Sequence, residues 1–358
     1  MSSTFDIEQI LVLIEKNPNI SDLHLSGGEG VSYRLNGEIV REEQAGKISN
    51  EAIEVVLRQL FQGNPQRFDK FLWDKEADFA FVSRAGVPYR VNAFLKTGRI
   101  GIVMRKINAI ARKLEDLIFS DIAESIKKNI LSAKKWLYLV TGPTGSGKST
   151  SLVAMLEFLN ETKNANLITI EDPIEFVFQE QKCLISQREI WHDTRSFANA
   201  LRAAMREDPN IIFVGEIRDR ETAESVLMLA ETGHLVFSTL HTGSAANTVN
   251  RLISFFPPEI QASVADRLAE SLIGIQSQVL VKTKDGAGRV GIFEVMLNTT
   301  SVRNNIKKRE IEQIDNIIET SSLIWMITLK KYAQRLIDKW IIDISEVDGL
   351  FINTSQPV

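Results

Sequence analysis

The spacing of apolar residues predicts a small α+β domain at the start of the chain. A helical spacing covers residues 5–16, and a second one covers about 50–61. Apolar and polar residues alternate in the segments between and after them, which predicts strands. These segments are 21–40, with a Gly27-Gly28 turn and an Asn36-Gly37 hairpin signal, then 77–82, 89–95 and 100–105. We therefore place the first domain at residues 1–107.

The pattern changes after a short charged stretch, residues 108–116, which we interpret as a linker. A helical segment over about 118–132 comes next, followed by short, continuous apolar runs between further helical segments. These runs are 137–140, 167–170, 211–214 and 235–239. Continuous runs of this length suit strands that are buried on both faces of a parallel sheet. We predict an α/β core over 117–298, with a last strand at 289–296, and a helical region over 299–358.

The first of these runs leads into a glycine-rich loop that fits the phosphate-binding pattern G-x-x-x-x-G-K-[ST] between a strand and a helix. Its residues are Gly142, Pro143, Thr144, Gly145, Ser146, Gly147, Lys148, Ser149 and Thr150. The glycines permit backbone angles at which N–H groups close around phosphate oxygens. We expect Lys148 to reach the β- and γ-phosphates and the Ser149 hydroxyl to bind Mg²⁺. The loop therefore predicts binding of a nucleoside triphosphate, and a glycine turn without a ligand is the alternative.

Carboxylates follow two of the other predicted strands. Glu216 follows strand 211–214, which we expect beside the P-loop strand, at the carboxyl end of the sheet where ligands bind. A carboxylate there can polarise the attacking water or hold the water shell of a metal. Glu171 begins an acidic group with Asp172 and Glu175, and three such carboxylates repel one another unless a cation or arginines share the site. Solvated carboxylates at strand ends are the alternative for both.

Two histidines flank the strand 235–239. A strand that ends in Thr-x-His can place an imidazole donor at the γ-phosphate, so we expect His241 to sense that phosphate. We also expect His234 to lie at the nucleotide. The alternative is a histidine with a structural hydrogen-bond partner, which is the interpretation that we give to His24.

Phosphoryl transfer also needs positive charge to stabilise the negative charge of the transition state. Arg202 and Arg206 are spaced i, i+4, which predicts one face of one helix, and we expect both to be catalytic. Further arginines lie on the predicted strands of the first domain: Arg84, Arg90, Arg99 and Arg105. We expect Arg90 and Arg105 to bind the nucleotide, which requires the two domains to close on it. Surface ion pairs are the alternative for each arginine.

Composition disfavours several other classes of protein. The formal net charge of −4 lacks the basic excess that is typical of nucleic-acid-binding proteins. No apolar run approaches the ~20 residues of a membrane span, and the N-terminus has no signal-peptide pattern. The single cysteine, Cys183, permits neither an intrachain disulfide nor a cysteine zinc cluster. We expect a cytoplasmic protein that neither binds nucleic acid nor inserts into a membrane.

In this order, the motifs resemble those of the type II/type IV secretion and pilus ATPase family, most of all its retraction members. The matching segments are 21–26, an N-terminal signature; 90–94, a first-domain strand; 142–150, Walker A; 170–176, the Asp box; 202–219, Walker B; and 232–242, the His box. The resemblance implies a PAS-like N-terminal domain and a RecA-like ATPase core. It also implies that Glu216 is the catalytic acid and Glu171 a site acid, and that both join Ser149 in holding Mg²⁺.

Members of this family form hexameric rings in which ATP hydrolysis rotates one domain against the other. The resemblance therefore implies a homohexamer that uses ATP and Mg²⁺. It further implies that the chain drives an inner-membrane platform protein at the pilus base. Its implied location is cytoplasmic, peripheral at the inner face of the cytoplasmic membrane.

Within the family, the residues favour a retraction motor for twitching motility. Assembly and type II secretion members carry an extra N-terminal domain and usually a four-cysteine zinc module, whereas this chain starts at the shared domain and has one cysteine. Residues 302–306 also partly resemble a C-terminal segment linked to retraction, with Asn305 at an apolar position. The alternatives are an assembly or accessory retraction motor, a RecA-like nucleic-acid translocase, and a regulatory ring that binds nucleotide without turnover.

Tryptophans stand at positions where the family has glycine. Four of the five are Trp136, Trp191, Trp325 and Trp340, and the fifth, Trp73, falls at an expected turn. Glycine at a helix end serves a left-handed conformation that tryptophan adopts poorly. Our hypothesis is that the source organism reads the codon UGA as glycine, whereas the printed sequence was translated with UGA as tryptophan. The alternative is a divergent chain with tryptophans packed at subunit contacts. Lys330, at a family aspartate position, is explained by neither.

Overall fold

The computed structural model describes residues 7–17, 19–35, 38–42, 46–107, 111–286, 288–321 and 326–347. The chain forms two compact units. The first comprises Met1–Ile110 together with two short segments, Asp172–Val177 and Glu189–Asp193. The second comprises Ala111–Glu171, Phe178–Arg188 and Thr194–Val358. The main division falls inside the stretch 108–116, although part of that stretch forms a short helix.

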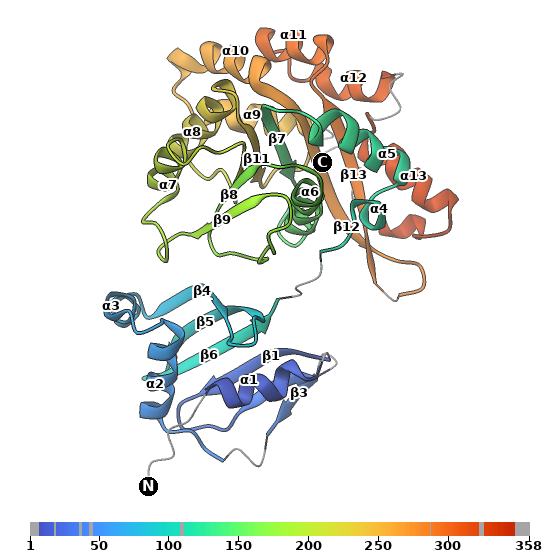
Figure 1. Ribbon diagram of the computed structural model, residues 1–358. Helices are drawn as coiled ribbons and strands as arrows, with labels where there is room; N and C mark the ends of the chain where they lie inside the picture. Colours follow the sequence, from blue (N-terminus) through green and yellow to red (C-terminus); the bar gives the residue numbers. More distant parts are fainter. Residues whose placement is uncertain are drawn as a thin grey trace, which may run out of the picture. The chain divides into compact units, whose positions relative to one another are not determined.

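An antiparallel sheet of six strands organises the first unit (Figure 1). Its order is β3-β2-β1-β6-β5-β4. The strands are β1 (Ile20–Ser26), β2 (Ser32–Leu35), β3 (Glu38–Arg41), β4 (Glu76–Val82), β5 (Pro88–Lys96) and β6 (Arg99–Lys106). Alternate residues of the sheet share one hydrophobic core with the helices α1 (Ile7–Glu15), α2 (Asn50–Leu60) and α3 (Pro65–Asp74). The predicted strands are confirmed, and the hairpin signal at Asn36-Gly37 lies outside the described residues.

Helix α3 was not predicted from the sequence. The side chain of Asn64 accepts hydrogen bonds from the N–H groups of Gln66 and Arg67, and Pro65 stands in the first turn. Both features are typical of a helix start. Trp73, which we expected at a turn, lies inside this helix, one residue before its end.

A mixed sheet of seven strands organises the second unit, in the order β13-β12-β7-β11-β10-β8-β9. The strands are β7 (Trp136–Thr141), β8 (Asn166–Glu171), β9 (Leu184–Glu189), β10 (Ile211–Val214), β11 (Leu235–Leu240), β12 (Leu272–Lys282) and β13 (Arg289–Leu297). The strands from β12 to β8 pair in parallel, and β13 pairs antiparallel with β12. The apolar runs that predicted β7, β8, β10 and β11 are almost wholly buried, as expected for central strands.

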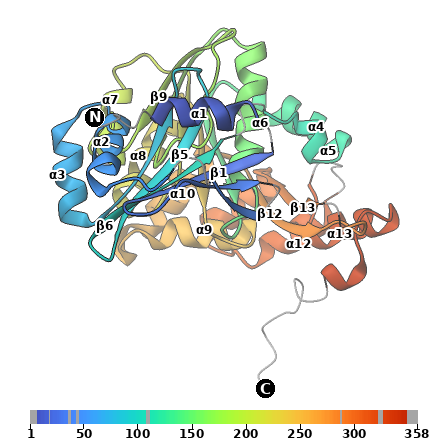
Figure 2. The same ribbon diagram turned by 90° about the horizontal axis from the view of Figure 1, so that it is seen from below.

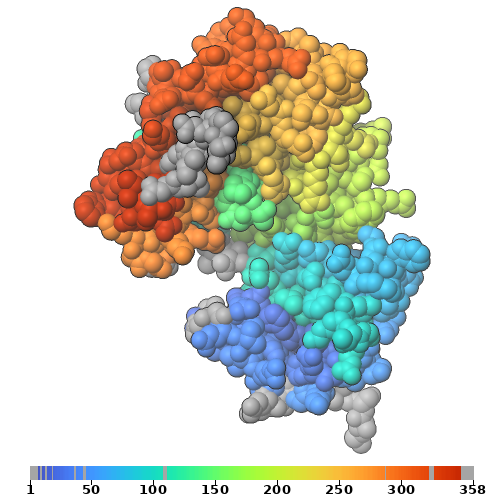
Figure 3. Space-filling model, turned by 180° about the vertical axis from the view of Figure 1, so that it is seen from behind, coloured from blue at the N-terminus to red at the C-terminus, as the bar shows by residue number. Residues whose placement is uncertain are grey.

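Helices and the C-terminal region complete the second unit. The helices are α4 (Leu114–Leu117), α5 (Ser120–Ile126), α6 (Lys148–Thr162), α7 (Phe197–Ala204), α8 (Arg220–Glu231), α9 (Ala245–Ser254), α10 (Gln261–Ser271), α11 (Thr300–Lys308), α12 (Gln313–Thr320) and α13 (Leu329–Asp338). The helix expected over 118–132 is α5 continued by a π-helical turn, Lys127–Leu131. In both ribbon views α12 and α13 lie on the β13 side of the sheet (Figures 1 and 2). The orange and red surface in Figure 3 belongs to the helices α10 to α13 and the strands β12 and β13.

Three tryptophans have backbone angles that favour glycine. The φ angles of Trp136, Trp191 and Trp340 are +94°, +68° and +59°. A left-handed backbone costs a residue with a Cβ roughly 1–2 kcal/mol. The side chains of Trp191 and Trp340 are also 59% and 75% exposed, so burial does not offset that cost. Trp325 lies outside the described residues. These angles support the hypothesis that the natural protein has glycine at the three described positions.

Candidate functional site

The glycine-rich loop connects β7 to α6 and has the backbone shape that its sequence predicts. The φ angles of Gly142, Gly145 and Gly147 are +147°, +76° and +86°, which lie in the region where glycine is favoured. A Cβ on Gly142 would lie 2.2 Å from the backbone oxygen of Gln278 on β12. Glycine is therefore required at this position for contact with the neighbouring strand as well as for the turn.

The loop leaves a positive end of a long helix open to a ligand. Helix α6 begins at Lys148, and its N-cap residue Gly147 offers no side-chain hydrogen bond to the first N–H groups. Such N–H groups and the helix dipole attract anions. The Lys148 Nζ donates to the backbone oxygens of Gly142 at 2.9 Å and Pro143 at 3.0 Å. Ser149 is the second residue of the helix, so its hydroxyl is carried at the same end.

The carboxyl ends of four adjacent parallel strands bring the predicted chemical groups to one edge of the sheet. Across this edge the P-loop follows β7, His241 follows β11, Glu216 follows β10, and Glu171 ends β8. The expectation that β10 lies beside the P-loop strand is wrong, because β11 lies between them and pairs with both. The strand that carries His241, rather than the one that carries Glu216, is therefore the direct neighbour of the P-loop strand.

Glu216 and His241 contact one another at this edge. The Nε2 atom of His241 lies 3.3 Å from Oε2 of Glu216, and the Glu216 carboxylate also binds the guanidinium of Arg218. The Glu216 side chain is mostly buried, whereas half of the His241 side chain is exposed. A fixed carboxylate beside an accessible imidazole can orient a water molecule and hold a polar donor toward a ligand. The two residues predicted as catalytic acid and phosphate sensor thus form one pair.

Glu171 is buried at the end of β8. Its carboxylate accepts hydrogen bonds from Thr169 Oγ1 at 2.8 Å and from Gln187 Nε2 at 3.3 Å. The other two carboxylates of the acidic group, Asp172 and Glu175, belong to the first unit. Glu175 is paired with Arg90 of that unit, at 3.7 Å between the charged groups. Among the residues that the structure describes, no three His, Cys, Asp or Glu side chains are grouped to hold a metal ion.

The predicted pair of catalytic arginines does not share a helix face. Helix α7 ends at Ala204, so Arg202 is in its last turn and Arg206 lies beyond it. The chain leaves the helix before Pro209, where Asp208 has a φ of +51°. A residue before proline is disfavoured in the helical region, so the helix could not have continued through Asp208. Arg202 donates to Asn199 within the helix at 2.7 Å, and its side chain is mostly exposed.

His234 lies at the opposite end of β11 from His241. Its Nδ1 is 2.9 Å from the backbone oxygen of Leu229 and 3.1 Å from Thr232 Oγ1, at the C-terminal end of α8. At about 3.3 Å per residue, the six residues of β11 separate the two histidines by roughly 20 Å. The structure therefore does not bring His234 to the P-loop of its own chain, and the ring has a structural partner.

Arginines of the first unit form a row with a buried carboxylate. In the registers of the sheet, Asp22 on β1 is paired with Arg105 on β6, which is paired in turn with Arg90 on β5. The Asp22 carboxylate binds Arg105 at 2.7 Å and Arg34 at 3.7 Å. Burial opposes its ionisation, but hydrogen bonds from Ser21 and Arg105 outweigh burial and keep the pKa of Asp22 below its usual range. Arg105 and Arg34 are therefore held by a charged partner.

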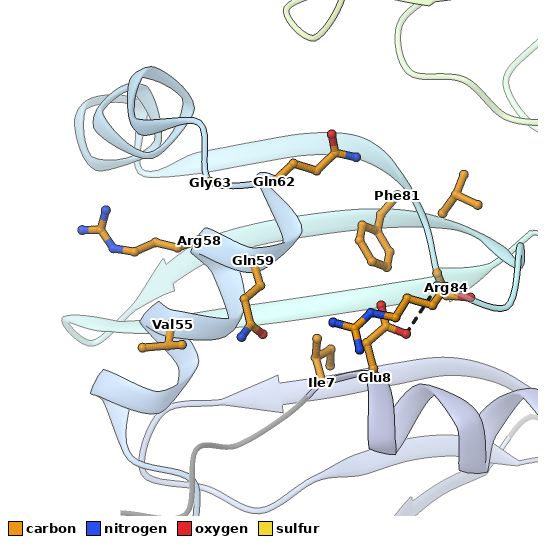
Figure 4. Close-up of a pocket in the computed structure, with 11 residues that line it drawn as sticks. Ile7, Glu8, Val55, Arg58, Gln59, Gln62, Gly63, Phe81 and Arg84 are labelled. Atoms are coloured by element: carbon orange, nitrogen blue, oxygen red, sulfur yellow. Dashed lines mark hydrogen bonds between the residues drawn. The ribbon is translucent and has the colours of Figure 1, made fainter.

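Arg90 is held by other carboxylates of the first unit. It binds Asp78 at 2.7 Å and Glu175 at 3.7 Å. A separate pocket of about 590 Å³ lies between α1, α2 and β4 of the same unit (Figure 4). Arg84 lines it, and the Arg84 backbone N–H donates to Glu8 at 3.4 Å. Arg84 thus contributes to this pocket, which contains neither Arg90 nor Arg105.

Residues of the second unit that the sequence pattern did not indicate support the loops of the site. Strand β12 was not predicted, because Gln276-Ser277-Gln278 interrupts its apolar pattern. The side chain of Gln278 contacts the P-loop directly. A glutamine pair at i, i+2 within a β-branched segment was the signal that could have identified it.

Glu294 on β13 is a second residue that the sequence did not single out. Its buried carboxylate accepts the N–H of Ala245, the first residue of α9, at 2.7 Å. This helix begins four residues after His241, so Glu294 fixes the end of the loop that carries the histidine. Burial raises the pKa of Glu294 to about 7, although the N–H of Ala245 favours the charged form.

A strand–loop–helix phosphate cradle, with a carboxylate and an imidazole on the next two strand ends, defines a P-loop nucleotide-binding protein. No helix among the described residues is both long and apolar enough to cross a membrane. The chain belongs to the type II/IV secretion system protein family, whose model matches residues 21–347.

Within this family, the chain is similar to proteins that are named for pilus retraction or twitching motility. The chain is 42% identical over 338 residues to the type IV pilus retraction ATPase PilT of Pseudomonas aeruginosa, which covers 94% of this chain and 95% of the relative. It is 43% identical over 314 residues to a twitching motility protein of Neisseria gonorrhoeae, covering 87% and 80%. A crystal structure of the pilus retraction motor PilT with bound ADP has a TM-score of 0.86 at 34% identity and covers 98% of both chains.

Proposed function

We propose that this chain is an ATP-hydrolysing motor that powers retraction of a type IV pilus. The observation that carries the proposal is the Glu216–His241 pair, 3.3 Å apart, on the sheet edge that also carries the P-loop. A carboxylate at this edge can accept a proton from an attacking water, a step that hydrolysis requires and nucleotide binding does not. Similarity to PilT over nearly the whole chain supports the choice of retraction as the process that hydrolysis drives.

In the proposed mechanism, the P-loop N–H groups and Lys148 bind the phosphates of ATP. For this step Lys148 exchanges its two loop carbonyl partners for phosphate oxygens, which are stronger partners because the hydrogen bonds are then between charged groups. Glu216 accepts a proton from the attacking water, and His241 donates to the γ-phosphate. Mg²⁺, when bound, would neutralise phosphate charge, with the Ser149 hydroxyl as a ligand and Glu171 and Glu216 holding its water shell.

The transition state also needs positive charge near the γ-phosphate. Arg202 and Arg206 are the candidates in the second unit, and both side chains are exposed. Arg90 and Arg105 of the first unit remain predicted nucleotide ligands. Each has a carboxylate partner at 2.7 Å, so binding phosphate would require it to exchange that partner.

The finer architecture is also part of the proposal. We assign the first unit as PAS-like and the second as RecA-like, and we propose that the chain works as a homohexamer at the cytoplasmic face of the inner membrane. Its proposed partner is the platform protein of the pilus base. The match to PilT along both units supports this assignment.

The test is the piliation of cells that lack the gene. Deletion should leave cells with surplus pili and without twitching motility, and the wild-type gene should restore motility. A gene that encodes Lys148→Ala should fail to restore it, because the ammonium that binds the phosphates is lost. Cells without pili would instead indicate an assembly motor, and cells with normal pili and motility would indicate an accessory role.

A further inference from the structure

Strand β12 lies beside the P-loop strand, and buried polar side chains of β12 contact that strand and the loop. Ser277 is paired with Thr141, the last residue of β7, and their hydroxyl oxygens are 2.8 Å apart. The next residue, Gln278, is 2% exposed. Its Nε2 donates to the backbone oxygen of Ser146 at 2.8 Å. A side chain of β12 therefore binds the P-loop backbone one residue before Gly147.

This hydrogen bond fixes the direction of a neighbouring N–H group. The carbonyl of Ser146 and the N–H of Gly147 belong to the same planar peptide group, in which they point in opposite directions. Because the carbonyl is held toward β12, the N–H must point away from β12. Gly147, which carries this N–H, has a positive φ, and without a Cβ it allows the peptide group to rotate more easily than another residue would.

A chain of hydrogen bonds holds the Gln278 amide in the orientation that this contact requires. Tyr138 on β7 donates its hydroxyl to Gln276 Oε1 at 3.3 Å, and Gln276 Nε2 donates to Gln278 Oε1 at 2.9 Å. The oxygen of Gln278 is thereby occupied, so its NH₂ group faces Ser146. Tyr138 and both glutamines are almost fully buried. Buried amides cost free energy unless they are hydrogen-bonded. If these positions were needed only for packing, apolar side chains would fill them at a lower cost in free energy.

We infer that Gln278 is a positioning residue for nucleotide binding, which orients the Ser146–Gly147 peptide so that the Gly147 N–H faces the phosphates. It acts through the backbone and does not touch the ligand. Loss of its amide leaves the Ser146 carbonyl without this donor and frees the peptide to rotate. One misdirected N–H to a phosphate should weaken nucleotide binding about tenfold. The hydrolysis step should change little, because Glu216 and His241 lie on other strands.

The test compares two variants that each remove one buried amide from the same face of β12. Gln278→Met removes the donor to Ser146, whereas Gln276→Met leaves that donor in place. We would measure the ADP dissociation constant by calorimetry, kcat and KM for ATP, and the unfolding temperature without nucleotide. Gln278→Met should raise Kd and KM about tenfold and leave kcat within about threefold. Gln276→Met keeps the donor to Ser146 and loses only the hydrogen bond that orients it, so it should raise Kd and KM by a smaller factor of about threefold.

Two results would overturn the inference. One is an unchanged Kd and KM in Gln278→Met. The other is an equal change in both variants that follows their unfolding temperatures, since this would indicate a purely structural role. If Gln278→Met does not fold, Gln278→Glu replaces it, because the protonated carboxyl can donate to Ser146 and the charged one cannot. Its KM relative to wild type should then fall as pH decreases, and a constant ratio would contradict the inference.

This inference rests on the proposed nucleotide-binding function, and the two fail differently. If the wild-type protein does not bind ADP, the proposed function fails. If the wild type binds ADP and Gln278→Met binds it equally well, only the role of Gln278 fails.

Discussion

Replacing Trp340 by glycine should stabilise the protein. Trp340 follows α13, and its N–H donates to the backbone oxygen of Ile337 at 2.8 Å. The N–H of Ile341 donates to the oxygen of Leu336 at 3.0 Å. This pair of hydrogen bonds is the Schellman motif, in which the residue at the position of Trp340 has a left-handed conformation and is usually glycine. Its φ of +59° agrees with that conformation.

The expected gain follows from two opposing contributions. Relief of the left-handed backbone should stabilise the folded state by roughly 1–2 kcal/mol. The substitution also removes a cation–π contact, in which Lys284 Nζ lies 4.1 Å from the centre of the indole ring. Because Trp340 is 75% exposed, we expect that contact to contribute about 0.5 kcal/mol. The net gain of about 1 kcal/mol corresponds to an increase of roughly 2–4 °C in unfolding temperature.

The assay is thermal unfolding of Trp340→Gly beside a matched control. Trp73 is as exposed as Trp340 but lies within α3, where glycine costs about 1 kcal/mol. Trp73→Gly should therefore lower the unfolding temperature. A Trp340→Gly variant that is less stable than the parent, or that behaves like Trp73→Gly, would refute the reasoning. Trp136→Gly and Trp191→Gly should add to the gain, because the three rings face different lysines, Lys135, Lys70 and Lys284.

The positive φ angles of the tryptophans also lead to a test of which residues the natural protein has at these positions. If UGA encodes glycine in the source organism, intact mass spectrometry of the native protein should give a lower mass than the printed sequence, by the difference between tryptophan and glycine at each such position. Agreement with the printed mass would eliminate the hypothesis and leave three tryptophans in a strained backbone.

Two further predictions concern titration and the histidines. Glu294 should make the protein less stable as pH rises from about 4.5 to about 7, because the folded state retains a proton that the unfolded state releases over this window. In urea unfolding, the neutral variant Glu294→Gln should therefore gain up to about 3 kcal/mol of stability relative to wild type between pH 5 and pH 8. An equal difference between variant and wild type at both pH values would contradict the burial argument. His234→Phe should lower the free energy of unfolding by about 1 kcal/mol through loss of its hydrogen bond to Leu229, and it should leave ATP hydrolysis unchanged. His241→Phe should instead reduce kcat for ATP hydrolysis. A large loss of activity in His234→Phe would restore the predicted role of His234 at the nucleotide.

Local sequence was sufficient where a short pattern determines a short structure. The P-loop and the strands β7, β8, β10 and β11 were predicted because continuous apolar runs and glycine positions are local signals. Helix α3 was not predicted, although Asn64-Pro65 marks its start, because its apolar side chains lie within 68–73 and cover fewer than two helical turns. Strand β12 was missed because its three polar residues face buried partners that only the folded chain supplies.

The candidate site was also predicted only where a local pattern determines the structure. The pairing of Glu216 with His241 depends on the order β7-β11-β10, which no local pattern contains, and the sequence placed β10 beside β7 instead. Arg206 was assigned to a helix face from its spacing, but the turn before Pro209 ends the helix first. His234 and His241 flank one strand in the sequence, yet a strand has two ends, and only one of them carries the P-loop.

The role of Glu216 in hydrolysis is tested most directly by the ATP turnover of the purified protein, wild type against Glu216→Ala, with and without DNA. If Glu216 activates the attacking water of a pilus motor, turnover should not depend on DNA, and Glu216→Ala should lose about 100-fold or more of it while ADP binding is retained. Turnover that DNA stimulates would indicate a nucleic-acid translocase. Absence of turnover in the wild type, or full activity in Glu216→Ala, would contradict the central claim that this carboxylate drives hydrolysis in a pilus motor.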